Sequence, residues 1–306
     1  MLYIDDGLVG TLLREGGLGD VLERAFLSWA QDKVAMQPRF RTDTDSFRLV
    51  TMGAVIPELG YAGSKVYSST QGRLSFRILL FSTHSGEALA VLESNTLTKV
   101  RTAACSVLAA RRYANPQSTE LGVFGLGPLG HEHALQFAHA FPIKTIRVCD
   151  PNVDASALHA LQSQTGADVQ HVSAVEATKQ SHIIVTATRS LTPVFSGHDL
   201  NPGTFVAAIG SCLAHAREID ATTVQRVHKV VVEWPEQTLQ DTGDLVLFED
   251  QPALHQKIEA LAETLTLSSA QGYDPEKLVM YNAVGIALED IAAAGLVYEL
   301  HQQIKP

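Results

Sequence analysis

The sequence predicts an α/β protein in which a doubly wound parallel sheet is combined with a second, α+β domain. Two observations support this prediction. From residue 114 to residue 277, short apolar runs alternate with helix-like runs, as the βαβ units of a parallel sheet require. Between residues 47 and 93, several strand-like runs lie close together in the sequence, which is typical of an antiparallel or mixed sheet.

The first domain opens with a predicted helix over residues 17–33, where apolar side chains recur at the spacing of one helix face. Four strand-like runs follow, separated by Gly and Ser turns: residues 47–51, 63–67, 76–82 and 88–93. A helix over residues 98–113 is expected to cross into the second domain. It should end near Asn115, because a residue that precedes a proline disfavours the helical conformation.

Residues 120–150 are the most informative stretch: a short apolar strand, a glycine turn, a helix and a second strand. In a dinucleotide-binding βαβ unit, the first glycine permits the tight turn, the second lets the backbone approach a pyrophosphate, and the third lets the helix pack on the strand. The start of the helix also favours a bound anion. We therefore predict a Rossmann-type domain whose cofactor contacts include Gly125, Gly127, Pro128, Leu129 and Gly130.

The second strand of this unit ends at Asp150, about twenty residues beyond the last glycine of the turn. At that position a carboxylate can accept hydrogen bonds from the 2′-hydroxyl of an adenosine ribose. The same carboxylate would repel a 2′-phosphate. We therefore expect NAD(H) to be favoured over NADP(H).

The remainder of the central region continues the alternation. The expected helices lie at 155–165 and around residue 175, and the expected strands at 168–172, 182–187, 204–209 and 227–232. After these strands, residues 277–302 read as one long helix with a face of small apolar side chains. So small a face suggests close packing, and we expect this helix to return to the first domain.

Composition excludes several classes of protein. The chain is 45% hydrophobic and 18% charged, with a formal net charge of −10, so a soluble globular protein is expected and a nucleic-acid binder is not. The chain shows no signal peptide and no apolar run of membrane-spanning length, which makes the cytoplasm the expected compartment.

The thiols and histidines give no sign of a metal site. Cys105, Cys149 and Cys212 are too widely separated for a zinc site or a disulfide framework. We expect His131 and His133 to be exposed or capping side chains, because their spacing does not place both on one helix face.

Residues 97–104 read Leu-Thr-Lys-Val-Arg-Thr-Ala-Ala, which resembles a segment that precedes the nucleotide domain in the ornithine cyclodeaminase/μ-crystallin family. Further segments resemble that family in its order: 79–81 with 85–90 before this segment, and 125–127 and 284–290 after it. The resemblance implies a homodimer with a substrate-binding and dimerisation domain at 1–113 with 278–306. It also implies that residues 114–277 form the Rossmann domain that holds NAD or NADP.

The same resemblance implies which side chains grip the substrate carboxylate: Arg41, Lys65 and Arg101. Arg39 stays open as an alternative to Arg41, which we prefer because the family's arginine directly precedes a threonine. An arginine fork matches a carboxylate bidentately, whereas a lysine supplies a movable charge whose pKa falls on burial. Lys65 and Arg101 are the candidate catalytic residues.

Four further positions are expected at the cofactor. The resemblance places Thr102 at the phosphates and both Thr186 and Thr188 beside the adenosine and ribose. Thr188 and Gly210 should lie at the carboxyl ends of their strands, where open α/β sheets bind ligands.

One departure from the family pattern bears on the substrate. Cys212 stands where cyclodeaminases carry an aspartate that serves the side-chain amine of the substrate. A thiol offers no fixed negative charge unless its pKa is depressed. Nearby, His215 is a candidate acid or base with a plain loop residue as the alternative, and Glu218 is expected to act as a structural cap. Cys212 is therefore a candidate substrate contact that puts ornithine specificity in doubt.

The resemblance implies an NAD(P)-dependent oxidoreductase that transfers hydride at the α-carbon of a small amino or imino acid. Reduction of a cyclic ketimine such as Δ1-pyrroline-2-carboxylate is the favoured case, with Arg41 and Arg101 holding the carboxylate and Lys65 assisting protonation. The alternatives are an ornithine cyclodeaminase that forms L-proline and ammonia, or an amino acid dehydrogenase. A catalytically silent, crystallin-like protein that binds NAD(P) is the non-enzyme alternative.

Overall fold

The computed structural model describes residues 1–246, 248, 250–267 and 272–304. Contacts between residues divide the chain into two compact units, Met1–Cys105 with Gly285–Pro306 and Ser106–Val284. We call them unit 1 and unit 2. The domain ranges predicted from the sequence place the boundaries after residue 113 and before residue 278. Residues 247, 249, 268–271 and 305–306 of these ranges lie outside the described residues.

Unit 1 is built on a six-stranded sheet with the strand order β1-β6-β5-β4-β3-β2. Its strands are β1 (Leu2–Ile4), β2 (Ala35–Asp43), β3 (Arg48–Ile56), β4 (Tyr61–Thr70), β5 (Arg73–Ser82) and β6 (Ala88–Glu93). Its helical elements are α1 (Asp6–Leu13), α2 (Leu18–Ala30), the short η1 (Pro57–Leu59) and α12 (Ala287–Gln303), while α3 (Asn95–Tyr113) begins in this unit. Only the β1–β6 pair is parallel among the described pairs, so the sheet is mixed, as predicted.

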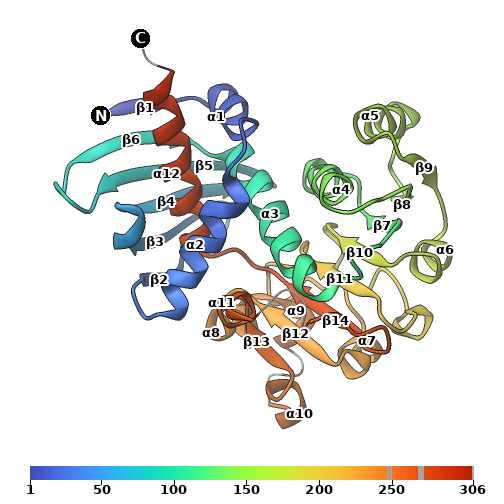
Figure 1. The fold of residues 1–306 in the computed structure, drawn as a ribbon. Coiled ribbons are helices and arrows are strands. Elements are labelled where there is room, and N and C mark those ends of the chain that lie inside the picture. Colours follow the sequence, from blue (N-terminus) through green and yellow to red (C-terminus); the bar gives the residue numbers. More distant parts are fainter. Residues whose placement is uncertain (247, 249, 268–271, 305–306) are drawn as a thin grey trace. The chain divides into compact units, whose positions relative to one another are not determined.

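Helix α12 packs across one face of this sheet, against β3, β4, β5 and helix α2 (Figure 1). Small residues make that close approach possible. A Cβ atom on Gly295 would lie 2.4 Å from Cδ2 of Tyr61, and one on Gly63 would lie 2.8 Å from Cδ1 of Ile291. The small apolar face that the sequence shows is therefore the contact surface between α12 and the sheet.

Unit 2 is built on an eight-stranded sheet with the strand order β13-β12-β14-β11-β10-β7-β8-β9, in which all described pairs are parallel. Its strands are β7 (Glu120–Phe124), β8 (Thr145–Cys149), β9 (Asp168–His171), β10 (Ile183–Thr186), β11 (Phe205–Ala208), β12 (Lys229–Val232), β13 (Ile258–Ala260) and β14 (Val279–Asn282). This parallel sheet and the mixed sheet of unit 1 confirm the predicted fold class.

Helices connect these strands in a doubly wound pattern (Figure 1). They are α4 (Pro128–Ala140), α5 (Ala155–Thr165), α6 (Ala174–Lys179), α7 (Ala221–Arg226), α8 (Pro235–Asp241), α9 (Gly243–Val246), α10 (Pro252–His255) and α11 (Leu261–Thr266), with the short η2 (Gly197–Asp199). No helix in the described part of the chain combines the length and apolar character that crossing a membrane requires.

The prediction of a single helix over residues 277–302 is wrong. The first part of that run is β14, which pairs with β11 and β12 in the middle of the parallel sheet, and only the second part is α12. A strand buried on both faces is a continuous apolar run, which periodicity alone does not distinguish from a buried helix. Gly285, with φ of +80°, adopts the left-handed conformation between the two elements.

Candidate functional site

A buried cluster of opposite charges lies between the sheet of unit 1 and α12. Lys65 comes from the middle of β4 and is only 2% exposed, because its side chain points to the face that α12 covers. Its Nζ donates to Oδ1 of Asp290 at 2.9 Å and to Oγ1 of Thr98 at 2.8 Å. The Lys65 ammonium is thus fixed by one carboxylate and one hydroxyl.

Arg101, from α3, shares the same carboxylate. Its Nε donates to Oδ1 of Asp290 at 2.9 Å, and its Nη1 pairs with Oε2 of Glu289 at 2.5 Å. Both acids are fully buried and lie in the first turn of α12, where the positive end of the helix dipole favours negative charge. The N-terminus of α12 therefore positions both cations that the sequence marked as catalytic candidates.

Gly285 completes this cluster. A Cβ atom there would lie 2.8 Å from Nη2 of Arg101, and the positive φ of the residue also favours glycine. Its carbonyl oxygen accepts a hydrogen bond from Nη2 of the half-buried Arg39 at 2.7 Å. The structure thus brings Arg39, the alternative left open by the sequence, to the same cluster as Arg101.

Arg41 has different surroundings. It pairs with Val50 in the β2–β3 register, whereas Arg39 falls where that register shifts between Gln37 and Phe40. The pKa of the exposed Asp43 is lowered, mainly by the hydrogen bond from Arg48 and in smaller part by the charge of Arg41. The role of Arg41 as a carboxylate contact stays a prediction.

Burial and charge set the pKa values in the cluster. Burial lowers the pKa of Lys65 to about 8, with Asp290 raising it and the charges of Arg101 and Arg39 lowering it further. Burial alone would raise the pKa of Asp290, yet the charges of Arg101 and Lys65 hold it below its ordinary value. Lys65 can therefore exist as ammonium or as amine near neutral pH while Asp290 stays ionised.

The glycine turn of unit 2 has the geometry that the sequence predicts. Gly125 has φ of +85°, and a Cβ atom on Gly130 would lie 1.9 Å from the carbonyl oxygen of Gly125. At Gly127, no heavy atom of the described residues other than Gly127 and its two chain neighbours lies within 4 Å of the place a Cβ would take. Pro128 and Leu129 begin α4, and no described side chain caps its N-terminus. The turn therefore presents open space and backbone N–H groups at a helix start.

Asp150 follows β8 and is tied to this turn. Its Oδ2 accepts a hydrogen bond from the backbone N–H of Leu126 at 2.8 Å, and its Oδ1 accepts one from Asn152 at 2.8 Å. The residue is half-buried. These contacts orient the carboxylate, and because each oxygen carries two lone pairs, both can accept a further hydrogen bond.

The other predicted cofactor positions divide between the two units. Thr186 ends β10, and Thr188 and Gly210 follow β10 and β11 at the carboxyl edge of the sheet. All three donate to the buried carboxylate of Glu218. Thr102 lies on α3 in unit 1, where its hydroxyl donates to the carbonyl oxygen of Thr98 at 2.7 Å.

The loop after β11 carries the residue that departs from the family pattern. Cys212 is exposed, as is His215. The loop is folded on itself by a hydrogen bond from the Ser211 hydroxyl to the carbonyl oxygen of Ala216 at 2.5 Å. Cys212 is thus displayed just beyond the carboxyl end of a central strand, where the sequence places a substrate contact.

The expectation that His133 is exposed or capping is wrong. His133 is fully buried, with Nδ1 2.8 Å from the carbonyl oxygen of Leu129 and Nε2 3.0 Å from the hydroxyl of Ser106. Burial lowers the pKa of His133 to about 4. A neutral imidazole that joins α3 and α4 accounts for this histidine.

Sequence reasoning missed the roles of Glu289 and Asp290. The pair was noted only as part of the family-like segment at 284–290. A pair of acids directly before an apolar helix is a signal for the first turn of that helix. Lys65 and Arg101, which both bond Asp290, lie 225 and 189 residues away from it in the sequence. No local pattern reveals pairs so far apart.

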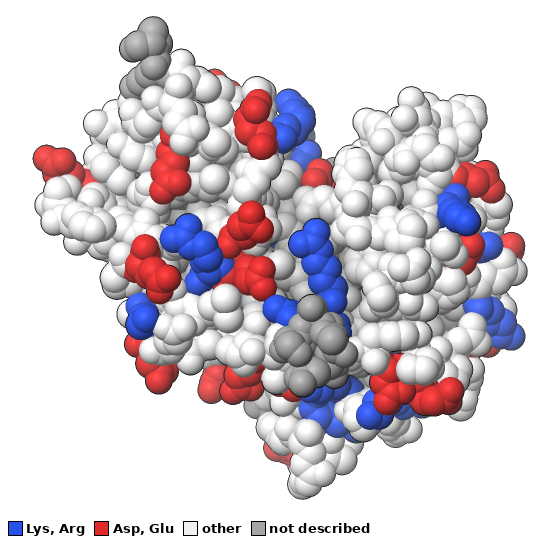
Figure 2. All heavy atoms as spheres, viewed as in Figure 1, with Lys and Arg blue, Asp and Glu red and all other residues white. Residues whose placement is uncertain are grey.

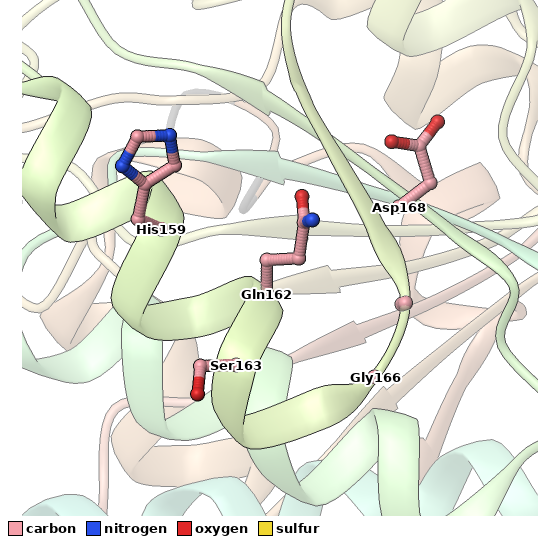
Figure 3. Close-up of a pocket in the computed structure, with 6 residues that line it drawn as sticks. His159, Gln162, Ser163, Gly166 and Asp168 are labelled. Atoms are coloured by element: carbon pink, nitrogen blue, oxygen red, sulfur yellow. The ribbon is translucent and has the colours of Figure 1, made fainter.

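Two surface features are separate from these sites. A hollow of about 590 Å³ is lined by α5 and the start of β9. Figure 3 shows His159 and Gln162 on α5 and Asp168 at the start of β9, three of the residues that line it. The hollow lies at the amino end of β9, whereas ligands of parallel sheets bind at the carboxyl ends. On the face shown in Figure 2, Lys and Arg side chains are interspersed with Asp and Glu.

The sequence model of the ornithine cyclodeaminase/mu-crystallin family matches residues 8–305. The chain belongs to that family. It is 30% identical to the ketimine reductase mu-crystallin of Mus musculus over 224 residues, which are 72% of this chain and 68% of that protein. It is 31% identical to a Delta(1)-pyrroline-2-carboxylate reductase of Bacillus cereus over 258 residues, 80% of this chain and 74% of that protein.

Solved structures of the family share the whole fold. A probable ornithine cyclodeaminase from Bordetella pertussis Tohama I is 42% identical with a TM-score of 0.95, covering 100% of this chain and 99% of that one. A Delta(1)-pyrroline-2-carboxylate reductase from Thermococcus litoralis, in complex with NADH and L-proline, is 25% identical with a TM-score of 0.91, covering 99% and 98%. These relatives confirm the expectation of an enzyme of this family.

Proposed function

We propose that this protein is an NAD(H)-dependent oxidoreductase that reduces a cyclic ketimine carboxylate, such as Δ1-pyrroline-2-carboxylate, to the corresponding cyclic amino acid. The observation that carries the proposal is the buried pair of Lys65 and Arg101 held by Asp290. A lysine with a pKa of about 8 beside a fixed arginine combines a proton donor with a carboxylate-binding group. Reductases among the relatives act on the same class of compound by name.

The charge of the cluster supports a substrate with a single carboxylate. Lys65 and Arg101 pair with two buried carboxylates, Glu289 and Asp290, and the adjacent Arg39, which donates to the carbonyl oxygen of Gly285, is a third cation. One positive charge is left over when all five groups are ionised. A substrate with one carboxylate would neutralise this charge. A second carboxylate on the substrate would lose its hydration without a cation to pair with.

Lys65 is the proposed proton donor. Reduction of a C=N bond adds a hydride to carbon and a proton to nitrogen, and the ammonium of Lys65 would deliver that proton. Arg101 would hold the carboxylate throughout, since a guanidinium does not lose its proton at neutral pH. Asp290 would then keep Lys65 protonated over more of the neutral range than burial alone permits.

The glycine turn of unit 2 fits a dinucleotide. The open space at Gly127 and the uncapped start of α4 would take a pyrophosphate, and the oriented carboxylate of Asp150 would accept a ribose hydroxyl. A bound nicotinamide would supply the hydride. Preference for NAD(H) over NADP(H) follows from the negative charge of Asp150, which would repel a 2′-phosphate.

A second candidate function is ornithine cyclodeamination, which the 42% identity to the probable ornithine cyclodeaminase favours. In this chain Cys212 occupies the position of the carboxylate that the predicted cyclodeaminase pattern requires. An exposed thiol offers no fixed charge to a substrate ammonium. We therefore place reduction first, and dehydrogenation of a small amino acid remains the same chemistry in reverse.

We further propose that the protein is a homodimer. Phe40, Leu49 and Val55 are 56%, 39% and 42% exposed, and they lie on the sheet face opposite Lys65. An apolar sheet face of this kind is typical of an interface. Light scattering should give twice the chain mass of 33.0 kDa, and Val55→Lys should shift the mass towards one chain. A wild-type protein of single-chain mass would refute the dimer.

The cytoplasm remains the compartment that the sequence predicts.

A paired assay tests the enzymatic proposal. Oxidation of NADH and of NADPH is followed with Δ1-pyrroline-2-carboxylate, and proline formation is followed from L-ornithine with NAD. We expect reduced cofactor to be consumed with the imine, faster with NADH, and no turnover of ornithine. Proline and ammonia from ornithine would establish cyclodeamination instead. Cofactor binding without turnover of any imino or amino acid would support the silent, crystallin-like alternative.

A further inference from the structure

We propose that Glu218 is a positioning residue for the cofactor: its ionised carboxylate holds the ends of β10 and β11 in the arrangement that binds NADH. The inference rests on the proposed use of a dinucleotide by unit 2. It concerns a residue that the sequence marked only as a structural cap.

The carboxylate of Glu218 is fully buried and accepts four hydrogen bonds. Oε1 accepts from the backbone N–H and the hydroxyl of Thr188, each at 2.6 Å. Oε2 accepts from the Thr186 hydroxyl at 2.8 Å and from the backbone N–H of Gly210 at 2.7 Å. Two donors meet each oxygen, so this environment suits the ionised form, which is acceptor-only.

The two strand ends approach each other closely around this carboxylate. A Cβ atom on Gly210 would lie 2.3 Å from the carbonyl oxygen of Thr188 and 2.6 Å from Oε1 of Glu218. Strands β10 and β11 are neighbours in the parallel sheet, and their carboxyl ends are where such sheets bind ligands. Glu218 therefore sets the spacing of the backbone at that edge.

A second carboxylate fixes Glu218 in turn. Oδ1 of Asp244, on α9, accepts the backbone N–H groups of Glu218 at 2.7 Å and of Ile219 at 3.0 Å. Oδ2 of Asp244 accepts from Nδ2 of Asn282, the last residue of β14, at 3.1 Å. Because β14 is the next strand beside β11, the network joins three adjacent strand ends.

This arrangement has a consequence for pH. Burial raises the pKa of Glu218 to about 7, opposed by the hydrogen bonds from Thr188 and Thr186 and assisted by the charge of Asp244. As pH falls through about 7, Glu218 would gain a proton on an oxygen that already accepts hydrogen bonds from two donors. One hydrogen bond would be lost and the two strand ends would separate.

Asp244 and Arg217 are charged groups close to Glu218 in the described part of the chain. Asp244 faces it from α9, and Arg217, which precedes it in the chain, uses its Nε to bond the carbonyl oxygen of Ile219 at 2.8 Å. His215 and Cys212 lie in the same loop but are exposed.

The test is the affinity for NADH, measured by fluorescence titration of purified protein between about pH 6 and pH 8.5, a range that spans the Glu218 pKa. In Glu218→Gln, an NH2 group replaces one carboxylate oxygen. Its two N–H donors then face the two donors from which that oxygen accepted hydrogen bonds. We expect about tenfold weaker binding at the upper pH, the loss of roughly one charge-assisted hydrogen bond. Wild-type affinity should fall towards low pH, whereas the affinity of Glu218→Gln should not.

The matched control is Glu120→Gln, which breaks an ion pair with Arg147 at the amino end of the same sheet. It should leave NADH affinity and its pH dependence unchanged. If Glu218→Gln does not fold, the pH titration of His215→Gln protein carries the test, because this variant removes the imidazole of the loop and keeps Glu218.

Equal affinity of wild type and Glu218→Gln, or equal pH dependence, would overturn the inference, and so would an affinity of His215→Gln protein that does not change with pH. The proposed function would fail differently, by an absence of NADH binding and imine reduction in the wild type.

Discussion

Replacing Asp290 with asparagine tests the buried charge cluster most sharply. The substitution keeps the shape of the side chain but removes the charge that Lys65 and Arg101 share. Lys65 would be left with the hydroxyl of Thr98, and Arg101 with Glu289. We expect two measurable effects, one on stability and one on the pH dependence of activity.

The size of the stability effect follows from burial. Removing one partner of a buried ion pair costs about 3–5 kcal/mol, because an uncompensated charge is left behind. Lys65 is only 2% exposed, so water screens little of this cost. Part of this cost is relieved when Lys65 loses its proton, since each unit of pKa shift corresponds to about 1.4 kcal/mol. A loss of about 3 kcal/mol at neutral pH should lower the melting temperature by roughly 6 to 12 °C.

The activity effect has a definite sign. Lys65 is proposed to act as ammonium, so kcat/KM for imine reduction should fall as pH rises through about 8 in the wild type. The Asp290 charge raises the pKa of Lys65, and removing it must lower that pKa. In Asp290→Asn the alkaline decline should therefore begin at lower pH.

Glu289→Gln is the matched control for this shift. Glu289 lies next to Asp290 in the same helix turn but pairs with Arg101 rather than with Lys65. Its removal should raise the KM for the imine while moving the alkaline limb much less. An Asp290→Asn enzyme with an unshifted alkaline limb would refute the role of Lys65 as proton donor. Unchanged melting would refute the buried charge cluster itself.

Three further predictions concern single residues. Arg101→Ala should lower kcat/KM at least about 100-fold, because about two charge-assisted hydrogen bonds to the substrate carboxylate are lost. NADH binding should be retained. Unchanged kinetics would remove Arg101 from the site. Asp150→Ser should weaken NADH binding about tenfold and NADPH binding less, as fluorescence titration would show, and equal weakening would contradict the ribose contact. Gly285→Ala should raise the KM for the imine because its Cβ displaces Arg101. Gly86→Ala is its control, with a similar positive φ of +74° but no described atom within 4 Å of the added Cβ, and equal effects of the two substitutions would contradict the steric argument.

The nucleotide-binding half could be predicted from the sequence because its signals are local. The glycine turn and Asp150 lie within one βαβ unit, and a short window of sequence reveals the turn. In the structure, Gly125 and Gly130 have steric reasons to be glycine. The structure then adds one contact that spacing alone does not show. Asp150 accepts the backbone N–H of Leu126, so the strand end and the turn are held together.

The charge cluster of unit 1 could be predicted only in part, because its members are far apart in the sequence. The family resemblance indicated Lys65 and Arg101, but their common partner Asp290 comes from the last helix. The preference for Arg41 over Arg39 depended on the neighbouring threonine. In the structure Arg39 bonds the carbonyl oxygen of Gly285, and it lies at a register shift in β2 that no sequence pattern indicated.

Transfer of a deuterium label from NADH to the imine carbon would demonstrate the proposed hydride transfer. NADH that carries deuterium on the transferred position is incubated with the purified protein and Δ1-pyrroline-2-carboxylate, and the product is analysed by mass spectrometry and NMR. We expect the wild type to form proline with one deuterium on the α-carbon, and Arg101→Ala to form little of this labelled proline. Proline formed without deuterium on the α-carbon, or no product from a protein that binds NADH, would contradict it.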